Sequence, residues 1–158
     1  MNSNRLKALS ELGQSVWYDY IRRDLVDGGG LARLIAEDGL SGMTSNPTIF
    51  EKAIAGSSLY DADIRGAGAG RSPAQVFEAL AVRDVQAAAD VFRPSFDARK
   101  GDDGFVSIEV GPQLARDTQG TIDEARRLWK ECGRPNVMVK IPGTAEGVPA
   151  NPVQITLK

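Results

Sequence analysis

The stretch that decides the fold is Asn136-Val-Met-Val-Lys140-Ile-Pro-Gly-Thr144. Its first six residues are mainly apolar and partly β-branched, and the Pro-Gly pair then stops the run, so the stretch predicts a strand over residues 136–141. Successive side chains of a strand point to opposite faces. One face of this strand is therefore aliphatic and suited to packing under helices, while Lys140 lies on the other face with Met138 and Asn136.

Three more segments predict strands, and helical patterns alternate with them. The strands are expected at residues 14–21, 40–45 and 105–110. Apolar spacing and capping residues predict helices at residues 6–12, 31–37, 48–55, 58–65, 72–92 and 121–132, and a polar loop at residues 93–103. This alternation favours an α/β fold of parallel βα units, either a doubly wound sheet or a TIM barrel. A (β/α)8 barrel takes about 250 residues, so four such units in 158 residues predict about half a barrel.

Composition narrows the chemistry that this chain can perform. It has no histidine and one cysteine, Cys132, which is expected in the core. These counts exclude histidine-dependent nucleophiles, histidine metal ligands, cysteine-cluster metal sites and an intramolecular disulfide. Any chemistry must therefore use carboxylates, lysine, hydroxyls or the backbone.

Charge and hydropathy bear on partners and location. A net charge of −2 gives no electrostatic reason to expect nucleic acid or an anionic membrane. No apolar run approaches the roughly 20 residues of a membrane helix, and the first residues lack the apolar region of a secretion signal. We therefore expect a cytoplasmic protein.

Three ionisable residues lie near the carboxyl ends of predicted strands, on the faces opposite the aliphatic ones: Asp19, Glu109 and Lys140. We expect these faces to point into the barrel, where active sites form at the carboxyl ends of the strands. An enclosed lysine can lose its proton and attack a carbonyl to form a Schiff base. Two nearby carboxylates could carry the accompanying proton transfers.

Each candidate also has an ordinary structural interpretation. A lysine near a strand end is usually solvated or ion-paired, Asp19 could cap the following helix, and Glu109 could pair with an arginine. Asn46 precedes Pro47 and by default caps the next helix. The glycine-rich residues 66–70 follow a helix rather than a strand, so they predict a linker and not a dinucleotide-binding loop. Gly101-Asp-Asp-Gly104 predicts a turn rather than a metal site.

Four motifs in order resemble those of transaldolases, most closely the bacterial type. They are Ser15-x-Trp17-x-Asp19, Thr44-Ser-Asn46-Pro-Thr-Ile-Phe50, Gly104-Phe-Val-Ser-Ile-Glu109-Val and Asn136-Val-Met-Val-Lys140-Ile-Pro. The resemblance covers residues 6–147, nearly the whole chain. It implies an enzyme of the pentose phosphate pathway that moves a dihydroxyacetone unit between sugar phosphates without metal or organic cofactor.

The resemblance also implies roles for individual residues. Lys140 would form the Schiff base, and Asp19 would take up the hydroxyl proton when the carbon–carbon bond breaks. Glu109 would assist dehydration to the imine through a water. Asn46, together with Thr44 of the same motif, would bind the hydroxyls of the dihydroxyacetone unit.

The resemblance stops after Gly147. The family continues with a helix, a fifth strand bearing Asn-x-Thr-Leu, and later strands with a serine and an arginine for the substrate phosphate. Here residues 148–158 form a divergent tail, in which Gln154-Ile-Thr156-Leu157 only faintly resembles the fifth-strand motif. We therefore expect one partial transaldolase-like domain over residues 1–158, weakly active or inactive.

Two alternatives stay open: a non-catalytic truncated scaffold, and a lysine-imine aldolase acting on a smaller substrate. Half a barrel also exposes two strand edges, expected at residues 16–21 and 137–141. Unpaired backbone groups at such edges are a template for another chain, so self-association is expected.

Overall fold

The computed structural model of the chain describes residues 4–67 and 70–150. Four parallel strands form one sheet in the order β1-β2-β3-β4. They are β1 (Val16–Asp19), β2 (Leu40–Thr44), β3 (Phe105–Glu109) and β4 (Val137–Lys140). Neighbours in the sheet are also neighbours along the chain, and each connection contains at least one helix. The predicted architecture of consecutive parallel βα units is confirmed.

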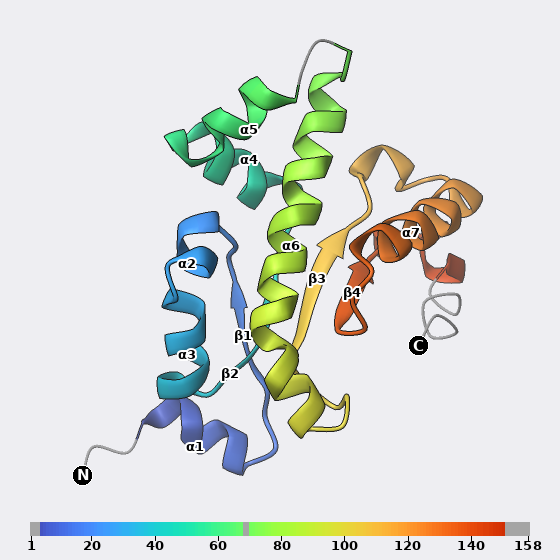
Figure 1. The fold of residues 1–158 in the computed structure, drawn as a ribbon. Helices are drawn as coiled ribbons and strands as arrows, with labels where there is room; N and C mark the ends of the chain where they lie inside the picture. The colour runs from blue at the N-terminus through green and yellow to red at the C-terminus, as the bar shows by residue number, and fades with distance from the viewer. Residues whose placement is uncertain (1–3, 68–69, 151–158) are drawn as a thin grey trace.

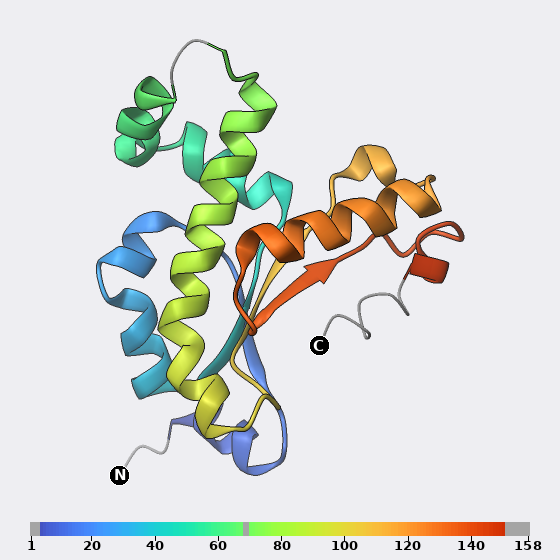
Figure 2. The same cartoon turned by 45° about the vertical axis from the view of Figure 1, so that its right-hand side comes forward.

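One helix precedes the first strand, and the others lie in the connections between strands. The helices are α1 (Arg5–Glu11), α2 (Arg23–Asp27), α3 (Gly30–Asp38), α4 (Pro47–Ala55), α5 (Asp61–Gly66), α6 (Pro73–Ala98) and α7 (Thr118–Cys132), with short 3-10 turns η1 (Ser58–Tyr60), η2 (Pro112–Leu114) and η3 (Val148–Ala150). The long helix α6 runs across the sheet, α7 lies along β4, and α1 lies at the end where the strands begin (Figure 1). The turned view shows α6 and α7 on the same side of the sheet (Figure 2).

The hydrophobic core lies between the sheet and these helices. Val106 of β3 and Phe92 of α6 are completely buried in it. The other side of the sheet is partly open, because Met138 of β4 is 37% exposed while its neighbours Val137 and Val139 are buried. The predicted alternation of this strand is confirmed at these three positions, and it leaves the face that carries Lys140 accessible.

Helix α6 is longer than predicted. It does not end at Phe92 but continues through Pro94 to Ala98, so residues 93–98 are helical rather than part of a loop. Pro94 cannot donate the usual backbone hydrogen bond. The extra turn is nevertheless stabilised, because Phe96 packs edge-on against Phe105, with ring centroids 5.3 Å apart.

Asn136 also departs from prediction. It precedes β4, and its buried side-chain amide donates hydrogen bonds to the backbone carbonyls of Ala89 in α6 (2.8 Å) and of Gly104 (3.0 Å). Its side chain is therefore committed to the helix side of the sheet and does not share a face with Lys140. The two hydrogen bonds that the buried amide nitrogen donates outweigh simple strand alternation at this position, although the Asn136 Oδ1 is buried without a hydrogen-bond partner.

Two predicted segments fall partly outside the described residues. The predicted linker at residues 66–70 begins within α5, because Gly66 is its last residue, and residues 68–69 are not described. Of the predicted tail, residues 148–150 form η3, and residues 151–158 lie outside the described part.

Candidate active site

The strand register brings the predicted site residues level with one another. Asp19 pairs with Thr44 between β1 and β2, and Glu109 pairs with Lys140 between β3 and β4. Each of the four is the last residue of its strand. All four therefore lie at the carboxyl edge of one parallel sheet, which is where βα barrels place their chemistry.

Lys140 and Glu109 form an ion pair across neighbouring strands. The Lys140 Nζ lies 3.0 Å from the Glu109 Oε2, and the side chains are 37% and 31% exposed. At that distance the two groups are in direct contact, so a proton can pass between them without a bridging water. A lysine amine freed of its proton is a nucleophile toward a carbonyl carbon, so the pair contains an amine and an adjacent proton acceptor.

Asp19 is held by a hydroxyl from the neighbouring strand. The Thr44 Oγ1 donates a 2.6 Å hydrogen bond to the Asp19 Oδ1. Asp19 itself is exposed, and its second oxygen has no hydrogen bond to another residue within the described chain. Thr44 thus orients a carboxylate that keeps one oxygen available for proton transfer.

Trp17 packs on the open face of the sheet, just before the level of Asp19. Trp17 lies two residues earlier on the same face, and its indole ring covers Gly42 of β2. A Cβ at position 42 would lie 2.4 Å from the ring, so only glycine leaves room for it there. Trp17 therefore packs across the open face of the sheet, one layer before the level of Asp19 and Thr44.

An open pocket of about 610 Å³ adjoins these strand ends. It is lined by Asp19, Asn46, Pro47, Thr48, Ile49, Lys52, Glu109 and Pro112. The structure thus brings Asp19, Glu109 and Asn46 to one hollow. Thr44 and Lys140 do not line the pocket. Thr44 contacts the lining residue Asp19, and Lys140 contacts the lining residue Glu109.

The first turns of α4 form one wall of the pocket. Sequence reasoning did not single out Thr48 or Lys52 as lining residues. A signal was nevertheless present, because the residue after a strand and the first turns of the following helix adjoin the carboxyl edge in βα units. Lys52, which is exposed, brings an amine to the lining of the hollow.

Asn46 has the structural role that its position before Pro47 predicts. Its Oδ1 accepts a 2.9 Å hydrogen bond from the backbone N–H of Ile49 and caps α4. Its amide nitrogen makes no hydrogen bond to another residue in the described ranges, although the residue lines the pocket. One end of the amide is therefore structural, and the other is available to a ligand.

Other classes of site find little support. No group of three or more Cys, Asp or Glu side chains in residues 4–67 and 70–150 is arranged to hold a metal ion. Over the same residues, no helix has the length and apolar character needed to cross a bilayer. The thiol of Cys132 is completely buried in α7, and burial raises its pKa to about 12.

Residues 16–153 match the sequence model of a family described as transaldolase/fructose-6-phosphate aldolase. The chain belongs to this family. It is 52% identical over 150 residues to a transaldolase of Thiobacillus denitrificans, covering 93% of this chain and 41% of that protein. A transaldolase of Trichodesmium erythraeum is 48% identical over 151 residues, covering 95% of this chain and 40% of that protein.

The matches cover nearly all of this chain but less than half of each relative. A protein of a Nostoc species named transaldolase 2 is 50% identical over 151 residues, again 95% of this chain but 40% of the relative. The chain thus spans about 40% of the length of these curated relatives. Its four parallel βα units correspond to the N-terminal part of a transaldolase-type TIM barrel.

Proposed function

We propose that this chain carries the Schiff-base part of a transaldolase site, which transfers a dihydroxyacetone unit between sugar phosphates in the cytoplasmic pentose phosphate pathway. The observation that carries the proposal is the Lys140–Glu109 contact of 3.0 Å at the carboxyl edge of the sheet. Asp19 lines the pocket that Glu109 also lines. Two carboxylates that line one hollow, and an amine in contact with one of them, are the groups that imine chemistry needs, without a metal or an organic cofactor.

The proposed chemistry assigns each group one task. Glu109 takes a proton from the Lys140 ammonium, and the freed amine attacks the carbonyl carbon of a ketose phosphate. Glu109 returns the proton through a water to the hydroxyl, which leaves as water while a protonated imine forms. Asp19 then removes the proton of the substrate hydroxyl next to the bond that breaks, and the electron pair of that bond moves into the protonated imine, which becomes an enamine. The aldehyde product leaves, and an acceptor aldehyde reverses these steps before water releases the lysine.

The remaining groups bind rather than react. The free amide nitrogen of Asn46 donates to a hydroxyl of the dihydroxyacetone unit. Thr44 contributes by orienting Asp19, to which its hydroxyl donates. The full activity of the relatives belongs to proteins of which this chain spans about 40%, so residues 1–158 are proposed as one partial domain with slow turnover.

Borohydride trapping tests the proposal directly. With fructose 6-phosphate, reduction should fix an adduct on Lys140, identified by peptide mass spectrometry, and Lys140→Met should abolish it. Glu109→Gln keeps the size of the side chain but not its proton acceptor, so adduct formation should slow by about 10²-fold. Labelling that persists in Lys140→Met, for example on Lys52 or Lys130, would refute the assignment of the nucleophile.

A lysine-imine aldolase is the second candidate, because the description of the matching family includes fructose-6-phosphate aldolase. The two activities differ in what the acceptor does. A transaldolase releases little free dihydroxyacetone and depends on an acceptor such as erythrose 4-phosphate. Release of free dihydroxyacetone at the same rate without an acceptor would favour the aldolase. Adduct formation without either product would favour a binding scaffold.

Self-association through the strand edges is part of the same proposal. Within the described residues, β1 and β4 each pair on one side only. Such edges favour pairing with another chain. Light scattering over a dilution series should therefore show a mass that falls on dilution; a constant monomer mass would contradict the proposal.

A further inference from the structure

A buried charged cluster joins α2, η1 and α6. Arg23 of α2 is 8% exposed and Asp84 of α6 is 3% exposed. The Arg23 Nε donates a 3.0 Å hydrogen bond to the Asp84 Oδ1. The Arg23 Nη2 lies at the same distance from that oxygen but makes no hydrogen bond. Charged side chains are rarely buried to this degree unless they are paired.

Tyr60 of η1 completes the buried part of this cluster. Its hydroxyl donates a 2.8 Å hydrogen bond to the Asp84 Oδ2 and accepts one of 3.2 Å from the backbone N–H of Arg23. The Arg23 guanidinium carbon lies 4.4 Å from the centre of the Tyr60 ring, a cation–π contact. Both Asp84 oxygens and one face of the Tyr60 ring are thereby occupied.

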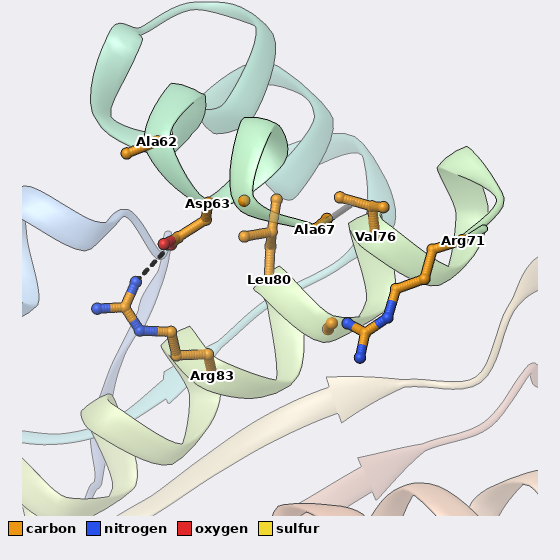
Figure 3. A pocket seen from close by; sticks show the side chains of 9 residues that line it. Ala62, Asp63, Ala67, Arg71, Val76, Leu80 and Arg83 are labelled. Carbon is orange, nitrogen blue, oxygen red and sulfur yellow. Dashed lines mark hydrogen bonds and ion pairs between the residues drawn. The ribbon is translucent and has the colours of Figure 1, made fainter. Parts of the chain in front are cut away.

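Asp63 of α5 connects the cluster to the surface. Its Oδ2 is 2.5 Å from the Arg23 Nη1 and 2.7 Å from the Arg83 Nη1. The Arg83 contact lies beside a hollow between α5 and α6, where Asp63 and Arg83 point toward each other across the gap between the helices (Figure 3). Arg83 is more than half exposed, so Arg23 and Arg83 bind the same carboxylate oxygen from the buried and the exposed side.

The cluster joins two segments that follow strands with pocket residues to the long helix α6. Helix α2 follows β1, which ends at Asp19, and η1 and α5 follow α4, which begins after Asn46, whereas α6 leads into the first residue of β3. We call residues 47–66, which comprise α4, η1 and α5, the α4–α5 arm. It lies against α6 near α2 at the end of the molecule where β1–β3 finish (Figures 1 and 2).

An arginine is suited to fixing geometry at such a junction. Its guanidinium is a planar fork with set donor directions, whereas a lysine ammonium is a point charge on a flexible stem. Buried ion pairs add little net stability, because desolvation offsets the attraction, but breaking one leaves an uncompensated charge. Burial raises the pKa of Asp84 although Tyr60 and Arg23 both act to lower it, which reflects how dry the junction is.

We propose that Arg23, held by Asp84 and Tyr60, is a positioning residue that fixes the α4–α5 arm against α2 and α6 and so sets the pocket wall carrying Asn46 relative to Asp19. This inference rests on the proposed function for its chemical consequence. Its structural content, the placement of the arm, does not depend on activity.

The test compares two substitutions of the same type. Arg23→Lys keeps the charge but loses the fork inside the cluster, whereas Arg83→Lys makes the same change on the exposed side of Asp63. Two quantities are measured for each: hydrogen exchange of residues 47–66 against residues 105–132, and the fructose 6-phosphate concentration that gives half-maximal trapping on Lys140. Tyr60→Phe, which removes only a hydroxyl, serves if Arg23→Lys does not fold.

Arg23→Lys should speed exchange in residues 47–66 but not in residues 105–132, and should raise the half-saturating concentration on the order of tenfold, with a smaller change in the trapping rate at saturation. Arg83→Lys should leave both quantities unchanged. Equal acceleration in both regions would reduce Arg23 to a general stabiliser, and unchanged exchange in the arm would overturn the proposal. If the unsubstituted chain shows no trapping, the proposed function fails, and the exchange pattern alone decides whether Arg23 positions the arm.

Discussion

Strands β3 and β1 each end in a carboxylate of the site, yet their surroundings differ. The first four residues of β3 are all buried, whereas β1 has two partly buried and two exposed residues. β3 lies between β2 and β4, while β1 has only β2 beside it among the described residues. Glu109 is therefore held by a strand embedded in the core. Asp19 depends more on individual contacts, such as the hydroxyl of Thr44.

The largest expected difference between the surroundings of β3 and β1 is in how much stability a substitution removes. Phe92 of α6 is completely buried in the cluster that also contains Val106 of β3, whereas Tyr18 of β1 is 39% exposed. Phe92→Ala should lower the free energy of unfolding by about 3–5 kcal/mol, because it removes a large ring from a packed core. Tyr18→Ala should cost less than about 1 kcal/mol, because much of its ring already contacts water. Urea denaturation of both variants measures the two values, and comparable losses would contradict the contrast.

The sequence predicts the site better than it predicts the supports of the site. Asp19, Glu109 and Lys140 were expected near strand ends because strand alternation and turn residues are local signals, and the strand register does bring them to one edge. No local pattern of this kind marks Arg23 as a buried residue. Its partners Asp63 and Asp84 lie 40 and 61 residues further along the chain, and an arginine is by default expected at the surface.

Helix boundaries failed for a similar reason. Arg93-Pro94 at the end of an apolar pattern favours a helix end, and the five-residue helix α2 is too short to show a clear period. Tertiary contacts stabilise both helical segments. Phe96 packs on Phe105 beyond the proline and stabilises the end of α6, and the buried contacts of Arg23 hold α2 in place. Neither contact can be read from spacing along the chain.

A pH dependence should mark the buried side of α7, next to β4. Burial raises the pKa of the Cys132 thiol to about 12 in the folded chain, against about 8.5 in an unfolded one. Between these values the unfolded state loses the proton and the folded state keeps it, so stability is present below about pH 8.5 and is lost as the pH rises. At pH 10 the loss should be about 2 kcal/mol.

Cys132→Ala provides the matched control for this dependence. The variant is less stable near neutral pH, because a buried side chain is shortened, but it lacks the thiol that titrates. The difference in unfolding free energy between the unsubstituted chain and the variant should therefore shrink from pH 8 to pH 10. A difference that stays constant would mean that the thiol is reached by solvent in the folded chain.

Asn46 allows structure and binding to be separated at the wall of the pocket. Asn46→Ala removes the cap of α4 and should cost about 1 kcal/mol. Asn46→Asp keeps a capping oxygen for the N–H of Ile49 and should leave stability nearly unchanged. If the amide nitrogen binds a substrate hydroxyl, both variants should weaken trapping on Lys140. If trapping weakens in Asn46→Ala but not in Asn46→Asp, the amide nitrogen does not bind substrate and Asn46 acts only as the cap of α4.

A small effect on stability is expected at the Glu109–Lys140 pair, where a large effect on chemistry is proposed. The Glu109–Lys140 pair is close, at 3.0 Å, but both side chains are about one-third exposed. Water screens such a pair, and holding two long side chains costs entropy, so its contribution is about 0–1 kcal/mol. Glu109→Gln should therefore lower the free energy of unfolding by less than about 1 kcal/mol, measured by urea denaturation beside the trapping assay. A loss of several kcal/mol would mean that the carboxylate supports β3 and β4, and slower trapping in that variant would then no longer distinguish proton transfer from damage to the sheet. Unchanged stability with slower trapping would separate the two and assign the loss to the proton acceptor beside the amine.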